Sequence, residues 1–188
     1  LDIGSQIDTT TSADVETSIK SGATLRAGNT VDISSHSRNV AFARFETTSI
    51  GGISITAGAD PTATTAGKTA TRLLGNVLAV DGISAGAASV KVTADAEDFA
   101  RSSIDTTNVG AVSVGDSAST SHSNPDVSVE LGSDGSKVRT SAGISGKATS
   151  QYDSDATSVA LSLGAITISS LDATADASGV DRSSSASQ

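Results

Sequence analysis

The sequence predicts an all-β fold, a parallel β-solenoid built from about three degenerate repeats. Three observations predict this fold: an internal repeat, a pair of tiny residues that recurs between β-branched segments, and a composition poor in aromatic residues. Apolar residues form 36% of the 188 residues, whereas aromatic residues form only 2%. An apolar set of Val, Ile and Ala suits a thin layer of strands better than a broad globular core.

The internal repeat has a long and constant offset. The segment from Val31 to Ile55 aligns without a gap on the segment from Val90 to Val114. Identical residues occupy six positions of this alignment: Val31/Val90, Ala41/Ala100, Thr47/Thr106, Thr48/Thr107, Gly51/Gly110 and Ser54/Ser113. A long offset that keeps both apolar and small residues is typical of stacked solenoid units.

The sharpest repeated element is an apolar residue, two tiny residues and an apolar-hydroxyl-apolar triplet. It occurs as Ile50-Gly51-Gly52-Ile53-Ser54-Ile55, Val109-Gly110-Ala111-Val112-Ser113-Val114 and Leu163-Gly164-Ala165-Ile166-Thr167-Ile168. The apolar parity of the strand switches across each tiny pair, which predicts a bulge or a corner there. We therefore expect the three tiny pairs at equivalent corners of the solenoid, and Ile53, Val112 and Ile166 pointing into the core.

A second repeated element divides the chain into modules. It places a turn glycine three residues before an aliphatic residue, at Gly22, Gly75 and Gly135. We interpret residues 1–188 as one solenoid fragment of a longer protein, with modules of roughly 20–74, 75–132 and 133–188. Because a usual coil takes about 20 to 30 residues, we expect two or three coils in each module, stacked about 4.8 Å apart.

Helical and disordered chains are the structural alternatives. No long stripe at helical spacing occurs, and the nearest candidate, Asp14 to Ile19, is too short. Strand-like alternation is clearer, since Val127, Val129 and Leu131 share one face. Leu, Ile, Val and Phe together form about a fifth of the chain, near the composition of disordered chains. A Ser/Thr/Ala-rich linker is therefore an alternative that circular dichroism would test.

The charges limit the choice of partners. The formal net charge is -9, with 12 Lys and Arg against 21 Asp and Glu, and the basic residues are scattered singly. This pattern offers no basic face to nucleic acid. The longest apolar stretch, Leu73 to Val80, is far too short for a membrane span. We expect self-association or contact with neighbouring repeats of the same chain, and contact with other cell-surface components.

The chain has neither Cys nor Met and starts at Leu1, so we interpret it as an excised or processed piece. The lack of Cys excludes disulfide scaffolds, thiolate zinc sites and cysteine nucleophiles. It also suits a protein exported unfolded through a pore, because an early disulfide would close a loop that has to pass through that pore.

Catalytic motifs are incomplete in this chain. Thr62 to Thr69 ends like a phosphate-binding P-loop but lacks the glycine at its first position. His36 and His122 are the two histidines, and the stretch Gly143 to Gly146 falls one residue short of a nucleophile elbow. We nominate no catalytic, cofactor-binding or metal-binding residue, and we expect that the chain is not an enzyme.

Acidic turns are the remaining ligand candidates. Calcium prefers carboxylate and carbonyl oxygens, and three acidic spots offer them: Glu130 to Asp134, Asp153/Asp155 and Asp172/Asp176. None has the ligand count of an EF-hand, so we expect no cofactor, with weak calcium binding at these turns left open. Sugar sites need stacking platforms, and the chain offers few aromatic side chains: Phe42, Phe45, Phe99 and Tyr152.

Two segments resemble the repeats of filamentous-haemagglutinin-like giant adhesins of Gram-negative bacteria, which are exported by two-partner secretion. They are Gly22 to Ser34 and Ser158 to Ala165. The resemblance implies a right-handed parallel β-helix that forms an extracellular shaft at the bacterial cell surface, with a role in adhesion, aggregation or matrix scaffolding. The secretion domain of that family is not recognisable here, so the export route stays open.

The leading functional hypothesis is a structural or adhesive segment of an extracellular filament. One alternative is a solenoid enzyme that acts on polysaccharides, which would need aromatic and basic subsites along a groove. Another is an ice-binding solenoid, which would need regular rows of threonine on a flat face. The threonines at 9–11, 47–48 and 106–107 recur too rarely for such rows.

Overall fold

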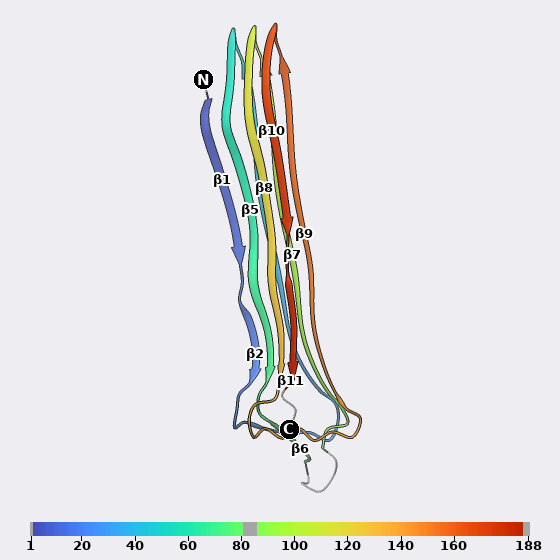
Figure 1. Ribbon diagram of the computed structural model, residues 1–188. Coiled ribbons are helices and arrows are strands. Elements are labelled where there is room, and N and C mark those ends of the chain that lie inside the picture. Colours follow the sequence, from blue (N-terminus) through green and yellow to red (C-terminus); the bar gives the residue numbers. More distant parts are fainter. Residues whose placement is uncertain (1, 81–85, 186–188) are drawn as a thin grey trace.

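The computed structural model describes residues 2–80 and 86–185, and these residues form two long facing sheets (Figure 1). The described residues contain strands and turns and no helix. The strands are β1 Asp2–Ser12, β2 Val15–Ile19, β3 Thr24–Arg26, β4 Val31–Ile50, β5 Ile53–Leu73, β6 Asn76–Leu78, β7 Val90–Val109, β8 Val112–Leu131, β9 Ile144–Leu163, β10 Ile166–Ala177 and β11 Val180–Ser185.

The first sheet has the strand order β1-β5-β8-β10, with β2 also on β5 and β11 also on β8. The second sheet has the order β4-β7-β9, and β3 and β6 pair in the loops at one end. All of these pairings are parallel. The chain runs along a strand of the second sheet, turns sharply, returns along the first sheet and begins the next coil. This is a flattened parallel β-solenoid, as the sequence predicts.

The strand register follows the internal repeat of the sequence. Val31 pairs with Val90, and the ladder continues without a break to Ile50 and Val109. The next coil pairs Val90 with Ile144. One repeat is therefore one coil of two long strands, so the expectation of two or three coils in each module is wrong. Each long strand has about 20 residues, so one coil contains as many residues as two or three coils built from shorter strands would.

The tiny pairs form the sharp corners of the solenoid, where β4, β7 and β9 each lead into the next strand. The corners stack directly, because the N–H of Gly51 donates to the carbonyl of Val109 and the N–H of Gly110 donates to that of Leu163, both at 2.9 Å. A Cβ added at Gly110 would lie 2.4 Å from the carbonyl oxygen of Gly51. The first position of the pair is therefore glycine because backbone meets backbone there.

Replacing Gly110 with alanine should lower the free energy of unfolding by about 1–3 kcal/mol, the usual cost of overpacking. Gly52→Ala is the matched control, since a Cβ at Gly52 meets nothing within 4 Å. Chemical denaturation measures both variants. Equal stability of Gly110→Ala and Gly52→Ala would contradict the close stacking of the corners.

The side chains beside the corners face the opposite way from the expectation. Ile53 and Ile166 are 70% and 57% exposed, and Val112 is only partly buried. Ser54 and Ser113, between the aliphatic positions, are buried. The prediction that Ile53, Val112 and Ile166 point into the core is wrong. The parity does switch at each corner, but the hydroxyl of the triplet faces inward.

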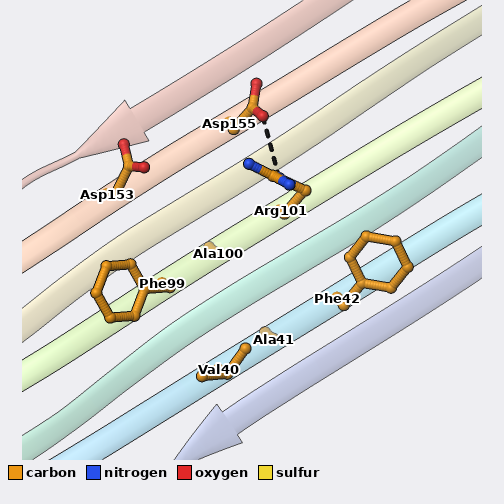
Figure 2. A pocket seen from close by; sticks show the side chains of 8 residues that line it. All are labelled: Val40, Ala41, Phe42, Phe99, Ala100, Arg101, Asp153 and Asp155. Carbon is orange, nitrogen blue, oxygen red and sulfur yellow. Dashed lines mark ion pairs between the residues drawn. The ribbon is translucent and has the colours of Figure 1, made fainter.

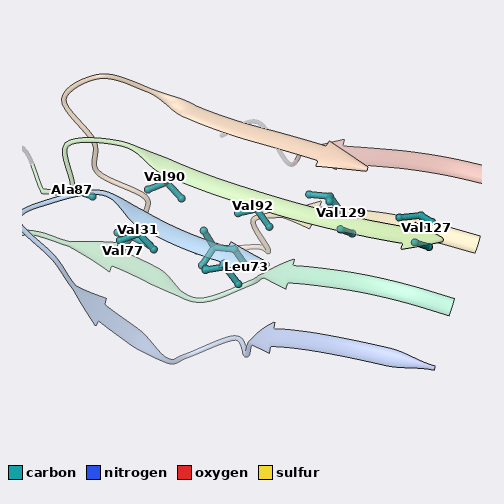
Figure 3. Packing of buried hydrophobic residues seen from close by; sticks show 11 residues of the cluster. Val31, Leu73, Val77, Ala87, Val90, Val92, Val127 and Val129 are labelled. Atoms are coloured by element: carbon teal, nitrogen blue, oxygen red, sulfur yellow. The ribbon is translucent and has the colours of Figure 1, made fainter. Parts of the chain in front are cut away.

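The larger apolar cluster of the core lies at the loop end, away from the corners (Figure 3). Leu73 and Val77 are fully buried there beside Val90 and Val92. Val127 and Val129, which share one face as the sequence predicts, are buried there, and Leu131 packs against the same cluster. Leu73 and most of the buried valines lie at this end, so hydrophobic burial contributes strongly to its stability.

Hydroxyl groups fill much of the space between the sheets farther along. Ser102 of β7 and Ser119 of β8 are 2.7 Å apart at their Oγ atoms, as are Ser121 of β8 and Ser154 of β9. The buried set also includes Ser35, Ser37, Thr65, Thr69, Thr71, Thr106, Ser117 and Ser123. Small paired hydroxyls let the sheets approach closely while each paired group keeps a hydrogen-bond partner. A large share of the serine and threonine residues therefore lies inside the solenoid.

Asp98 is a carboxyl group inside the solenoid, with no exposed surface. Asn39 of the preceding coil donates to Asp98 Oδ1 at 2.9 Å. Asp98 Oδ2 and Asn39 Oδ1 have no hydrogen-bond partner among the described residues. Burial raises the pKa of Asp98, and the hydrogen bond from Asn39 partly opposes this shift.

Candidate functional site

A shallow groove on the outer face of the second sheet is the candidate ligand site (Figure 2). It crosses β4, β7 and β9 and has a volume of about 240 Å³. Its lining residues are Val40, Ala41, Phe42, Phe99, Ala100, Arg101, Asp153 and Asp155. The two alanines face the interior, so their backbone forms the floor and the other six side chains form the walls.

The coil register brings these residues together. Val40, Phe99 and Asp153 occupy one row across the three strands, and the next outward-facing row holds the other three wall residues. Alternate residues of a strand share a face, so both rows point away from the core. Phe42 is 51% exposed, and Phe99 is partly buried between neighbouring strands.

Ion pairs hold the polar side of the groove. Arg101 Nε lies 3.1 Å from Asp155 Oδ2, on the next coil. Arg38 contacts the groove from the side, with its Cζ 6.0 Å from the centre of the Phe99 ring and its Nε 3.5 Å from Glu97 Oε2. Asp153 forms no ion pair within the described part of the chain. The groove therefore offers two phenyl rings, a neutralised Arg–Asp pair and one carboxylate open to solvent.

This arrangement can form contacts with a flat ligand that carries polar groups at its edge. The rings can stack against a flat apolar face, and the carboxylates and guanidinium can form hydrogen bonds with polar groups around it. Both groove carboxylates face an open surface, and that of Asp155 lies beside Arg101.

No family model, curated protein or solved structure matches this chain. No helix in the described part of the chain is long and apolar enough to span a bilayer.

The two histidines lie on opposite outer faces of the solenoid. His36 Nδ1 is 3.2 Å from Asp95 Oδ2 on the second sheet, and His122 Nδ1 is 3.8 Å from Asp176 Oδ2 on the first. Each histidine thus pairs with an acid of the adjacent coil. The P-loop-like stretch from Thr62 to Thr69 lies within β5, a strand that leads into β6 rather than into a helix. These positions do not converge on a common site.

The acidic spots are also separated. Asp155 pairs with Arg101, Asp176 with His122, and Glu130 Oε2 lies 3.4 Å from Arg72 Nε. Among the described residues, no group of three or more His, Cys, Asp or Glu side chains is placed to hold a metal ion. The expected weak calcium binding at these positions stays a prediction.

The aromatic residues divide between the inside and the outside. Phe45 lies on the inward side of β4, and Tyr152 lies on the inward side of β9 in the row of Asp98. Phe42 and Phe99 face outward and meet at the groove. We did not predict this pairing from the sequence, although the alignment of the internal repeat already places Val40 beside Phe99 and Phe42 beside Arg101.

Proposed function

We propose that this chain is a structural and adhesive segment of an extracellular filament, part of a large bacterial surface protein. The coils form a rigid bar, and outer-face residues such as those of the groove provide contacts. The resemblance of Gly22 to Ser34 and of Ser158 to Ala165 to filamentous-haemagglutinin-like repeats supports this role. So does the acidic surface, which keeps such a bar soluble.

The observation that carries the proposal is the unbroken coil register. The ladder between β4 and β7 joins the two strands along their whole length, and the ladder between β7 and β9 does the same. A stack of this kind grows by repeating one unit and is stiff along its hydrogen bonds. Such regularity suits a shaft, whereas a polysaccharide-acting enzyme needs a groove with enclosed acids and several stacking rings.

Particles coated with the folded chain test the role directly. Beads that carry the chain should aggregate or be retained on cell layers several-fold more than beads that carry a Leu73→Asp variant. The carboxylate of that variant, placed at a fully buried position, should prevent folding. Small-angle X-ray scattering of the free chain should show a flat bar, about 66 Å along its long strands at about 3.3 Å per residue. Beads that stay dispersed and unbound, or a compact globular envelope, would overturn the proposal.

A further inference from the structure

The outer face of the first sheet carries an aliphatic patch next to the corners. We call it the apolar tip, and it consists of two rows across β5, β8 and β10. Ile53, Val112 and Ile166 form the row nearest the corners, and Ile55, Val114 and Ile168 form the next. Ile53 is 70% exposed and Ile168 is 61% exposed. The patch continues around the corners to the exposed Ile50 and Leu163 on the second sheet.

Hydrophobic burial within one copy does not account for these residues. At the same level of the solenoid the interior holds hydroxyl and amide groups, with Thr56 Oγ1 donating to Asn108 Oδ1 at 2.8 Å and Ser54 Oγ to the same atom at 3.2 Å. Aliphatic side chains thus face water while polar ones are buried. The exposed aliphatic positions recur in three successive coils, and contiguous exposed aliphatic patches mark interaction sites.

The charges around the apolar tip indicate which partner fits it. The tip itself holds no charged residue, and the outward positions farther along these strands carry acids: Asp60, Asp116 and Asp172. An acidic rim repels anionic membranes and acidic proteins. A second copy avoids this repulsion if the two tips overlap with their strands antiparallel, because each acidic rim then lies beside the uncharged corner of the other copy.

We propose that two copies of this chain associate tip to tip through the outer face of the first sheet. The contact is isologous, with the same two aliphatic rows on both sides. The long strands of the two copies run away from the contact in opposite directions, which keeps their net charges of -9 apart. A patch on the order of several hundred Å² in each copy corresponds to a weak and reversible contact. This inference rests on the proposed filament role and names the partner and the surface within it.

Sedimentation velocity over a range of concentrations tests the contact. The wild-type chain should show a reversible monomer–dimer equilibrium, and the double variant Ile53→Lys/Ile166→Lys should raise its dissociation constant at least tenfold. The matched control is Thr62→Lys/Thr174→Lys, which adds the same charge in the same two strands, on the same face, in a row outside the tip. This control should dimerise like the wild type, and all three proteins should melt at similar temperatures.

Cross-linking locates the interface independently. The chain has no cysteine, so a single introduced thiol reports only its own position. Val112→Cys should form a disulfide-linked dimer on mild oxidation, whereas Thr120→Cys, on the same strand and face, should stay monomeric.

Three outcomes would overturn the inference: a wild-type chain that is monomeric at every concentration, a dimer that survives the Ile53→Lys/Ile166→Lys change, or binding to zwitterionic phosphatidylcholine vesicles without dimerisation. A bar-shaped monomer that still retains beads on cell layers would leave the filament role standing, so the two proposals fail separately.

Discussion

Replacing Leu73 with aspartate should abolish cooperative folding. Leu73 has no exposed surface, lies in one row with Ile19 and Leu131, and packs into the apolar cluster at the loop end. Burying an unpaired carboxylate costs several kcal/mol, and the lost aliphatic burial adds about 2 kcal/mol. The free energy of unfolding of a domain is only about 5–15 kcal/mol, so this single change should remove most or all of it.

Ile53→Asp is the matched control for this experiment. It introduces the same carboxylate into the same strand, β5, at a side chain that is mostly exposed. Its effect on the free energy of unfolding should stay within about 0.5 kcal/mol, as for other surface changes. Circular dichroism during thermal and chemical denaturation measures both. A folded Leu73→Asp variant beside an unfolded Ile53→Asp variant would show that the inside and outside of β5 have been assigned the wrong way round.

Replacing Asp98 with asparagine should stabilise the solenoid at neutral pH and change little at acidic pH. The pKa of Asp98 is raised in the folded state by burial, so the folded chain holds its proton more tightly than the unfolded chain. The stability that the neutral carboxyl group contributes is complete below the unfolded pKa of about 3.9. It is lost as the pH rises from there through the raised folded pKa.

The surroundings of Asp98 offer its charged form little compensation. Asn39 lies beside it in the preceding coil, and Tyr152 occupies the same row in the next coil. From the first sheet, Ser123 Oγ donates to the backbone carbonyl of Asp98 at 3.1 Å, and Thr65 Oγ1 donates to Ser123 Oγ. No cation pairs with Asp98 within the described part of the chain. An asparagine amide at this position has a donor for the unpaired Asn39 Oδ1. Satisfying such groups is worth about 1–3 kcal/mol.

Denaturation at pH 4 and pH 7 checks this prediction. The stability difference between Asp98→Asn and the wild type should be small at pH 4 and about 1–3 kcal/mol in favour of the variant at pH 7. Asp105→Asn, an exposed change on the same strand, should show no such difference. If the Asp98→Asn curve keeps the pH dependence of the wild type, the buried carboxylate does not control it.

The coil register was predictable because the residues that align in the internal repeat are the residues that pair in the ladder. Each row of the ladder keeps one environment, so Val31 and Val90 or Ala41 and Ala100 match across the offset that becomes the strand pairing. The corners were predictable for a related reason. The close approach between Gly110 and the carbonyl of Gly51 excludes a larger side chain. Glycine therefore occupies the first position of all three tiny pairs in the sequence.

The inside and outside of the strands near the corners could not be read in the same way. The usual inference places aliphatic residues inward, but here Ser54, Ser113 and Asn108 are buried and their aliphatic neighbours face out. In both cases aliphatic and polar residues alternate along the strand. The aliphatic face points inward in a usual strand and outward here, and the sequence pattern is the same. Only the position of the facing sheet distinguishes the two.

The coil architecture also governs how such a chain reaches its folded state. Strand partners such as Val31 and Val90 are a full coil apart in the sequence, and each corner separates strands of different sheets, so local hairpins are absent from the described ladders. The first coil has to close long loops, at a cost in conformational entropy, before any ladder hydrogen bonds can offset that cost. This order of events makes folding slow. Later coils then assemble on a finished edge, and the amide groups of β7 reach solvent only after a neighbouring strand has peeled away.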